Sequence, residues 1–220
     1  MKICWCNDIF KLPQGYEDAI CITTNGMVKK NGHAVMGAGI ALEANRRLKL
    51  SKELGLRLAE NGNQVFHLGV HRDRQTGTLM RVFSFPTKHD WKDPSDINLI
   101  RTSASQLVDH CNNIGIRHCY LPCPGCANGG LDWSTQVRPI LESILDDRFI
   151  IADKRIQMED HKMNENIDRM IQAYTRTVQD LQGMTKYVTD PLRQEFLKGC
   201  IITYQGIIQD LTNVLVTNRS

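Results

Sequence analysis

The sequence predicts an α/β fold followed by a pair of helices, and two observations lead to this prediction. Strand-like and helix-like segments alternate through residues 1–153, as they do in proteins that pack helices against a mixed sheet. Composition then changes near residue 153, because all but one of the seven prolines and all three tryptophans come before it. We therefore expect one α/β domain over residues 1–153 and a helical hairpin over residues 154–220.

The elements of the first domain are predicted from apolar runs bounded by turn residues. Strands are expected at residues 2–6, 18–24, 64–70, 79–85, 117–122 and 148–152. Helices are expected at residues 39–61 with an interruption at Gly55, at 95–113, and at 134–147. Ser95 is the predicted N-cap of the second of these helices. Pro86 is expected to end the fourth strand, because proline cannot donate a hydrogen bond to the sheet.

The C-terminal extension shows helical periodicity in both of its halves. Apolar residues recur at steps of three, four or seven, from Ile156 to Leu181 in the first half. The stripe of the second half includes Leu192, Phe196 and Val214. A helix with one apolar stripe is not stable alone. We therefore expect an antiparallel hairpin that packs on the first domain, on another copy of itself or on a partner.

Composition limits the class of protein. The 220 residues are 41% apolar and 23% charged, which is typical of a soluble globular protein. The formal net charge of +3 is too small to predict nucleic-acid binding from bulk charge. No run of about 18 apolar residues is present, and the N-terminus "MKICWCND" lacks the apolar core of a secretory signal. We therefore expect a cytoplasmic protein that does not associate with a membrane.

The cysteines invite a comparison with zinc sites. Cys123 and Cys126 form a C-x-x-C pair, with His118 and Cys119 nearby. A second ligand pair at zinc-ribbon spacing is missing, and glycines flank Cys126. Free thiols that pack as small apolar groups are therefore the favoured interpretation, and neither a metal ion nor a cofactor is predicted.

Two glycine-rich segments each lead from a predicted strand into a predicted helix. The first is "MGAGIAL", residues 36–42, and the second is "PCPGCANGGLDW", residues 122–133. Glycines let backbone N–H groups approach a ligand closely, and a helix N-terminus favours negative charge. Close packing explains one such loop about as well as ligand binding does. Two of them after different strands of one sheet predict a diphosphate site.

Four polar residues lie at predicted strand ends or loop ends, namely Asp8, Asn25, Lys88 and Asp132. If the sheet forms as predicted, they converge on one crevice at its carboxyl edge. Each also has a structural interpretation. Asp8 would be a turn residue, Asn25 part of an Asn-Gly turn, Asp132 a helix N-cap, and Lys88 a solvated surface lysine.

Several motifs resemble a known family. "CNDIFK", "ITTNGMVKKNGHAVMGAGIALEANRR" and "LPCPGCANGGLDWSTQVRPILE" resemble the macrodomain, an ADP-ribose-binding three-layer α/β/α fold, over residues 1–153. "FPTKHDW" and "GGLDW" resemble the DarG-type branch, whose members are DNA ADP-ribosyl glycohydrolases that remove ADP-ribose from thymidine bases. That branch is also similar to the human terminal ADP-ribose protein glycohydrolase, which acts on ADP-ribosyl glutamate and aspartate.

The resemblance implies a role for each candidate residue. Asp8 would bind the adenine amino group with Ile9 beside it, and Asn25 would contact the distal ribose. Lys88, Asp132 and Asn25 would form the catalytic group. The loop residues implied to bind the diphosphate are Met36, Gly37, Ala38, Gly39 and Ile40 in the first loop, and Gly125, Cys126, Ala127, Asn128, Gly129, Gly130 and Leu131 in the second.

The sequence departs from the family at two points. Ala41 stands where the more widespread hydrolytic macrodomains carry an aspartate, so their mechanism is not expected here. Ten residues separate Asn25 from Met36, more than we expect in the DarG-type branch. This longer segment would lie near the distal ribose and could change which acceptor fits. The resemblance does not extend to residues 154–220.

The resemblance thus implies an ADP-ribosyl glycohydrolase that acts on ADP-ribosylated thymidine in DNA. Lys88 would either attack the opened ribose or donate a hydrogen bond to the leaving group, with Asp132 as the proton shuttle. Trp91 would either stack on the linked base or pack in the core.

Other functions stay open at this stage. The domain could be a non-catalytic ADP-ribose reader, or a hydrolase of protein-linked ADP-ribose or of free derivatives such as ADP-ribose 1″-phosphate. It could also be an interaction protein in which the hairpin carries the function. Expected partners are ADP-ribosylated DNA or protein, and a toxin or a second copy bound through the hairpin.

Overall fold

The computed structural model describes residues 1–153 and 156–219. The chain divides into two compact units, Met1–Lys154 and Arg155–Ser220.

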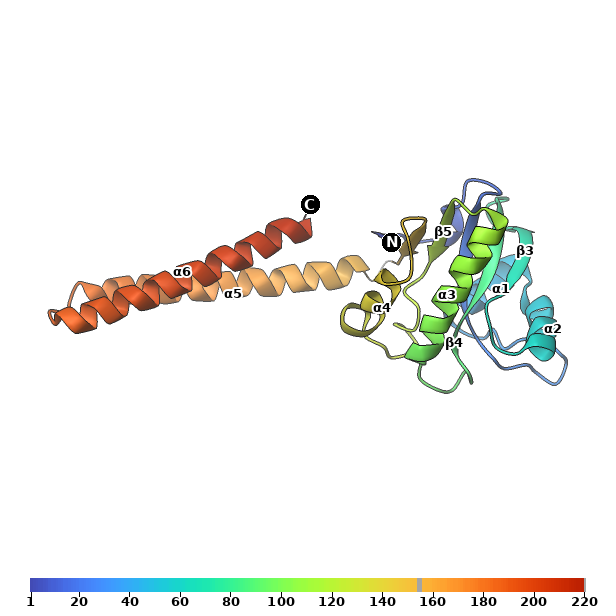
Figure 1. Ribbon diagram of the computed structural model, residues 1–220, viewed down its shortest axis with the longest axis horizontal. Coiled ribbons are helices and arrows are strands. Elements are labelled where there is room, and N and C mark those ends of the chain that lie inside the picture. Colours follow the sequence, from blue (N-terminus) through green and yellow to red (C-terminus); the bar gives the residue numbers. More distant parts are fainter. Residues whose placement is uncertain (154–155, 220) are drawn as a thin grey trace. The chain divides into compact units, whose positions relative to one another are not determined.

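The first unit is built on a sheet with helices packed around it (Figure 1). The sheet has six strands in the order β1-β6-β5-β2-β4-β3. The strands are β1 (Lys2–Cys4), β2 (Asp18–Asn25), β3 (His67–Arg72), β4 (Leu79–Lys88), β5 (His118–Leu121) and β6 (Phe149–Ala152). Neighbouring strands are parallel except for β3, which is antiparallel to β4. The predicted mixed sheet is confirmed.

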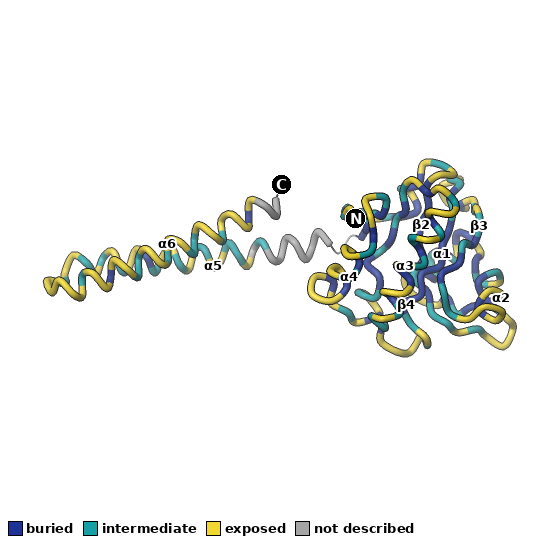
Figure 2. Tube along the Cα trace, viewed as in Figure 1, coloured by how far each residue is buried: buried dark blue, intermediate teal, exposed yellow. Residues whose placement is uncertain are grey.

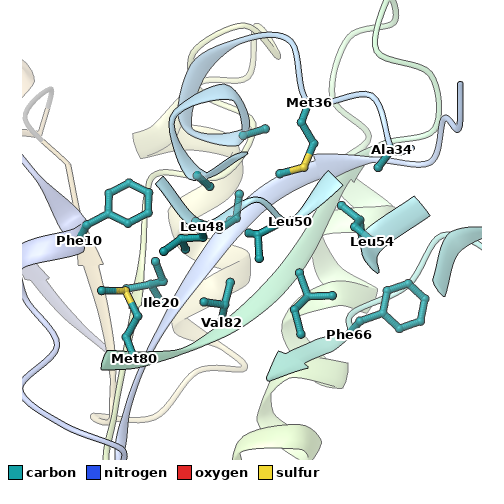
Figure 3. Packing of buried hydrophobic residues seen from close by; sticks show 14 of the residues in the cluster. Phe10, Ile20, Ala34, Met36, Leu48, Leu50, Leu54, Phe66, Met80 and Val82 are labelled. Carbon is teal, nitrogen blue, oxygen red and sulfur yellow. The ribbon is translucent and has the colours of Figure 1, made fainter. Parts of the chain in front are cut away.

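Helices pack on both faces of this sheet, because side chains alternate along each strand. The helices are α1 (Gly39–Leu48), α2 (Ser51–Asn61), α3 (Ile97–Ile114) and α4 (Arg138–Glu142), with short turns η1 (Ile9–Lys11) and η2 (Trp133–Val137). Ile20 and Val82 belong to the buried cluster that includes Leu48 of α1 and Leu54 of α2 (Figure 3). On the other face, the ring of Phe83 lies 6.0 Å from that of His110 on α3. The predicted three-layer α/β/α fold is therefore confirmed.

The break between the first two helices differs from the prediction. Lys49, and not Gly55, ends α1, in a left-handed conformation with a φ of 61°. Gly55 lies inside α2, where a Cβ atom would stand 2.0 Å from the carbonyl oxygen of Gly32. This glycine is therefore required because the loop after β2 passes directly against the helix.

Replacing Gly55 by alanine should destabilise the first unit, although alanine usually improves a helix by about 1 kcal/mol. The added methyl group meets backbone, and overpacking of this kind costs about 1–3 kcal/mol. Urea unfolding followed by tryptophan fluorescence measures this unit alone, because Trp5, Trp91 and Trp133 all lie in it. The matched change Gly183→Ala in the second unit meets open space, so it should stabilise its own helix in circular dichroism. A Gly55→Ala protein as stable as the wild type would contradict this packing.

Two predicted boundaries are also wrong. Pro86 does not end β4, which continues to Lys88 alongside β2. The proline is accommodated because the pairing of β3 with β4 extends only to Phe83, so its missing N–H faces no strand on that side. The N-cap of α3 is Asp96 and not Ser95. Its carboxylate accepts hydrogen bonds from the N–H groups of Asn98 and Leu99.

The second unit is a hairpin of two long helices, α5 (Ile156–Thr185) and α6 (Pro191–Arg219). The rings of Tyr174 and Tyr204 lie 5.7 Å apart across it, as expected for antiparallel helices joined by a short connection. No helix among the described residues is long and apolar enough to span a membrane.

The predicted stripe of the second helix is wrong at three positions. Leu192, Phe196 and Val214 are exposed, whereas Leu197 and Leu215 are buried. Figure 2 shows that the helices of the hairpin are mostly exposed or intermediate. Because apolar residues occur on several sides of α6, the sequence pattern alone did not identify the side that packs on α5. Ile156 and Met163, which belong to the first predicted stripe, lie outside the residues whose side chains are described.

Candidate functional site

Asn25 and Lys88 lie side by side at the carboxyl edge of the sheet. They are the last residues of β2 and β4 and are paired in the strand register. The amide of Asn25 donates to the carbonyl of Val35 over 3.0 Å, and its oxygen accepts from the N–H of Met27 over 3.0 Å. The side chain therefore closes the base of the loop formed by residues 26–35.

The ammonium group of Lys88 connects two neighbouring loops. It donates to the carbonyl oxygen of Asp93 and, over 2.8 Å, to that of Asn128 in the second glycine loop. The carbonyl of Lys88 itself accepts from the amide of Asn63 over 2.9 Å. An ammonium has three N–H groups, so these contacts hold the lysine in place and leave one N–H for a ligand.

The second glycine loop requires glycine at two positions. Gly125 has a φ of 78°, and its carbonyl accepts from the N–H of Leu131 over 3.1 Å. A Cβ atom at Gly129 would stand 2.0 Å from the hydroxyl of Ser95 and 2.3 Å from the carbonyl oxygen of Gly125. The loop is therefore folded tightly on itself and on Ser95, with Asn128 exposed at its surface.

The first glycine loop faces the second. Helix α1 begins at Gly39, and its N-cap, Ala38, supplies no side-chain hydrogen bond. The first N–H groups of a helix have no partner within it and attract anions. The amide nitrogen of Asn128 lies 3.5 Å from where a Cβ of Gly39 would stand. The two loops thus lie opposite each other, in the arrangement that a diphosphate between them would need.

Ile9 and Met36 are placed differently from the exposed Gly37 and Ala38. Both side chains are buried in the hydrophobic cluster, in which Figure 3 shows Met36. A ligand could therefore reach these two residues only through their backbone.

Asp8 forms part of a charged group that the sequence did not reveal. Its carboxylate accepts from Phe10 N–H over 3.1 Å and from the guanidinium of Arg47 over 3.0 Å. Arg47 is only 3% exposed, stacks on the ring of Phe10 and also pairs with the buried Asp73. Asp8 keeps 26% exposure, so its outer edge stays accessible. The sequence signal for Arg47 is its spacing of three residues from Ala44, which places both on one face of a helix, and in the structure this face of α1 is buried.

Asp73 should make the free energy of unfolding of the first unit depend on pH in the acid range. Burial by itself would raise the pKa of Asp73, but hydrogen bonds from Arg47, Gln75 and Thr76 lower it from 3.8 to about 2. A depressed pKa contributes stability that is complete above the unfolded value and is lost as the pH falls from about 4 to about 2. We expect this loss to be about 2 kcal/mol in urea unfolding, and to be missing in Asp73→Asn. The control Asp109→Asn changes an exposed carboxylate and should keep it. Equal pH profiles for the wild type and Asp73→Asn would contradict the assignment.

Asp132 is the N-cap of η2, as its structural interpretation proposed. Its carboxylate accepts from the hydroxyl of Thr135 over 2.6 Å and from its N–H over 2.7 Å. These hydrogen bonds lower the pKa of Asp132. The side chain is exposed and ionised at neutral pH, so it can accept a proton but has none to donate.

Trp91 is 53% exposed, which excludes the core-packing interpretation. The ammonium of Lys92 lies 5.4 Å from the centre of its ring. The loop that carries both residues follows directly after Lys88.

The cysteine and histidine residues considered as zinc ligands do not come together at one metal site. The thiol of Cys119 lies in the core, 3.5 Å from that of Cys21, and His118 bonds to Asp18. Within the described part of the chain, no three His, Cys, Asp or Glu side chains are placed to hold a metal ion. A shallow hollow lined by His118 and Arg148 lies where β5 and β6 begin, at the edge opposite the glycine loops.

No family model matches the chain, but comparison with curated proteins gives several relatives. The DNA ADP-ribosyl glycohydrolase of Thermus aquaticus is 29% identical over 115 residues, which is 52% of this chain and 32% of the relative. The enzyme of the same name from Mycobacterium tuberculosis is 30% identical over 123 residues, 54% of this chain and 34% of the relative. The chain therefore spans about a third of the length of these curated relatives.

Solved structures agree with the sequence matches. The macrodomain of Mycobacterium tuberculosis DarG superposes with a TM-score of 0.54 at 26% identity, covering 69% of this chain and 96% of that one. The macrodomain of Thermus aquaticus DarG superposes with a TM-score of 0.52 at 23% identity and the same coverage, which supports the fold. The first unit of this chain therefore has the macrodomain fold, and it is similar in sequence and in structure to the macrodomains of DarG proteins.

Proposed function

We propose that residues 1–153 bind ADP-ribose attached to a macromolecule and hydrolyse the bond that attaches it, with thymidine bases in DNA as the acceptor. The two curated relatives are both named DNA ADP-ribosyl glycohydrolases, which supports this class of reaction. The observation that carries the proposal is the contact between Lys88 and Asn128. It joins a lysine at the sheet edge to a glycine loop that faces a helix N-terminus, which supports one site that combines the proposed reactive group with the proposed diphosphate cradle.

The binding half of the proposal uses the two glycine loops and Asp8. The diphosphate would lie between the N–H groups at Gly39 and those of the second loop, where backbone donors and the helix dipole favour negative charge. The exposed edge of the Asp8 carboxylate would accept the adenine amino group, while Arg47 holds that carboxylate in place.

The catalytic half uses Lys88, Asn25 and Asp132. The remaining N–H of the Lys88 ammonium would donate to the group that leaves, as negative charge builds on it. Asp132 would accept a proton from a water molecule whose oxygen bonds to the anomeric carbon as the glycosidic bond breaks. The proton then passes to the departing base. Asn25 would orient the distal ribose through the amide hydrogen that Val35 does not use.

We propose that the hairpin binds another protein chain, either a second copy of this chain or a toxin. The exposed apolar side chains of Tyr187, Leu192 and Phe196, at or near its connection, support a contact of this kind.

The direct test is release of ADP-ribose from single-stranded DNA that carries ADP-ribosyl thymidine, measured by mass spectrometry. A peptide carrying ADP-ribosyl glutamate and free ADP-ribose 1″-phosphate serve as the competing substrates. Release from the DNA supports the proposal. Tight binding of ADP-ribose without release from any of the three would leave a reader of ADP-ribose, and release from the peptide alone would change the acceptor.

A further inference from the structure

The loop of residues 89–94, which we call the acceptor loop, is held firmly beside Lys88. Its carbonyl at His89 accepts from the N–H of Gly26 over 3.0 Å, and its carbonyl at Asp93 accepts from the Lys88 ammonium. Within the loop, the N–H groups of Lys92 and Asp93 both donate to Asp90. A short loop with this many bonds presents its remaining side chains in a fixed position.

Trp91 is the side chain that this loop presents. Tryptophan is highly buried on average, and burying one removes a large apolar area from water. Here the ring is 53% exposed on a loop that starts after Lys88 and is bonded back to it. A group attached to a sugar beside Lys88 would therefore lie next to the loop that carries Trp91.

Basic side chains lie in the acceptor loop and in the segment bonded to it. Lys92 lies over the Trp91 ring, and the segment bonded to His89 continues into the exposed Lys29 and Lys30. The loop also carries two acidic residues, Asp90, whose carboxylate accepts from the N–H of Lys92, and the exposed Asp93. An aromatic face with lysines near it is the usual means by which proteins bind single-stranded nucleic acid.

We propose that Trp91 forms an acceptor subsite that stacks on the nucleobase bearing ADP-ribose, with Lys92, Lys29 and Lys30 contacting the phosphates beside it. This inference rests on the proposed function and specifies its substrate class as single-stranded nucleic acid. A nucleobase has an aromatic face that can stack, whereas a glutamate or aspartate side chain has none. The subsite therefore selects a base-linked over a protein-linked acceptor.

Binding measured without turnover tests this separately from the reaction. In an Asp132→Asn background, which removes the proposed proton acceptor and keeps the contact of Lys88 with the acceptor loop, a thymidine oligonucleotide carrying ADP-ribose should bind roughly ten-fold more tightly than free ADP-ribose, because stacking of the base adds to the affinity. Adding Trp91→Ala should remove that advantage and leave the affinity for free ADP-ribose within about two-fold. Trp91→Phe should keep most of it, since phenylalanine still offers a ring.

The matched control is Tyr16→Ala, an aromatic residue of similar exposure at 57% that precedes β2 at the other edge of the sheet. It should leave both affinities unchanged. If the Trp91→Ala variant and its parent bound the oligonucleotide with equal affinity, the subsite would be overturned. An equal loss of affinity for the oligonucleotide and for free ADP-ribose would also overturn it, because it would indicate a structural role for Trp91. The release assay with Asp132 intact decides the proposed reaction independently of these outcomes.

Discussion

Replacing Lys88 by alanine is expected to lower the rate of ADP-ribose release at least a hundred-fold. Loss of one group that acts directly on the reacting atoms typically costs two to four orders of magnitude in rate. The substitution also removes the hydrogen bonds to Asp93 and Asn128, so a weaker affinity for ADP-ribose should accompany the loss. Single-turnover release from modified DNA, together with calorimetry on free ADP-ribose, separates the two effects.

The control for this experiment is Lys52→Ala, which removes an exposed lysine from α2 and should leave release unchanged. A Lys88→Ala protein that binds ADP-ribose and releases it at the wild-type rate would remove the lysine from the mechanism. Aspartate-based or water-only hydrolysis would then have to be considered.

Replacing Gly129 by valine should abolish ADP-ribose binding and destabilise the first unit. The new side chain would occupy the position of the Ser95 hydroxyl and of the Gly125 carbonyl, which is backbone and cannot rotate away. Overpacking of this kind costs about 1–3 kcal/mol, and opening the loop would also displace Asn128 from Lys88. We expect the Kd for ADP-ribose to rise more than ten-fold, measured by calorimetry on protein whose fold is checked by tryptophan fluorescence.

Gly15→Ala is the matched control, because a Cβ atom there meets open space. Stability and affinity should both stay close to the wild type. If Gly129→Val bound ADP-ribose as well as Gly15→Ala does, the second glycine loop could not be the diphosphate cradle.

The sheet and the convergence of its strand ends could be predicted because both follow from local patterns. Apolar runs identify strands, and the carboxyl ends of parallel strands meet at one edge, so Asn25 and Lys88 were expected together and are paired. The N-cap interpretation of Asp132 likewise depended only on its neighbours.

Features that depend on distant segments were not predicted. An arginine on a helix is usually solvated, and the burial of Arg47 depends on Asp8 and Asp73, which come from other parts of the chain. The role of Gly55 depends on a loop more than twenty residues earlier in the sequence. The packed side of α6 is likewise decided by its partner helix, because its own sequence is apolar in several directions.

The two carbonyl contacts of Lys88 also bear on which route the reaction can follow. Because they occupy two of the three N–H groups, the third position on the nitrogen serves both routes. Attack on the sugar first requires another group to remove the proton at that position, and the lone pair then faces the sugar while both carbonyl contacts persist. Donation to the leaving group requires the same proton to stay. The two routes therefore differ in one proton and not in the position of the lysine or of the second glycine loop.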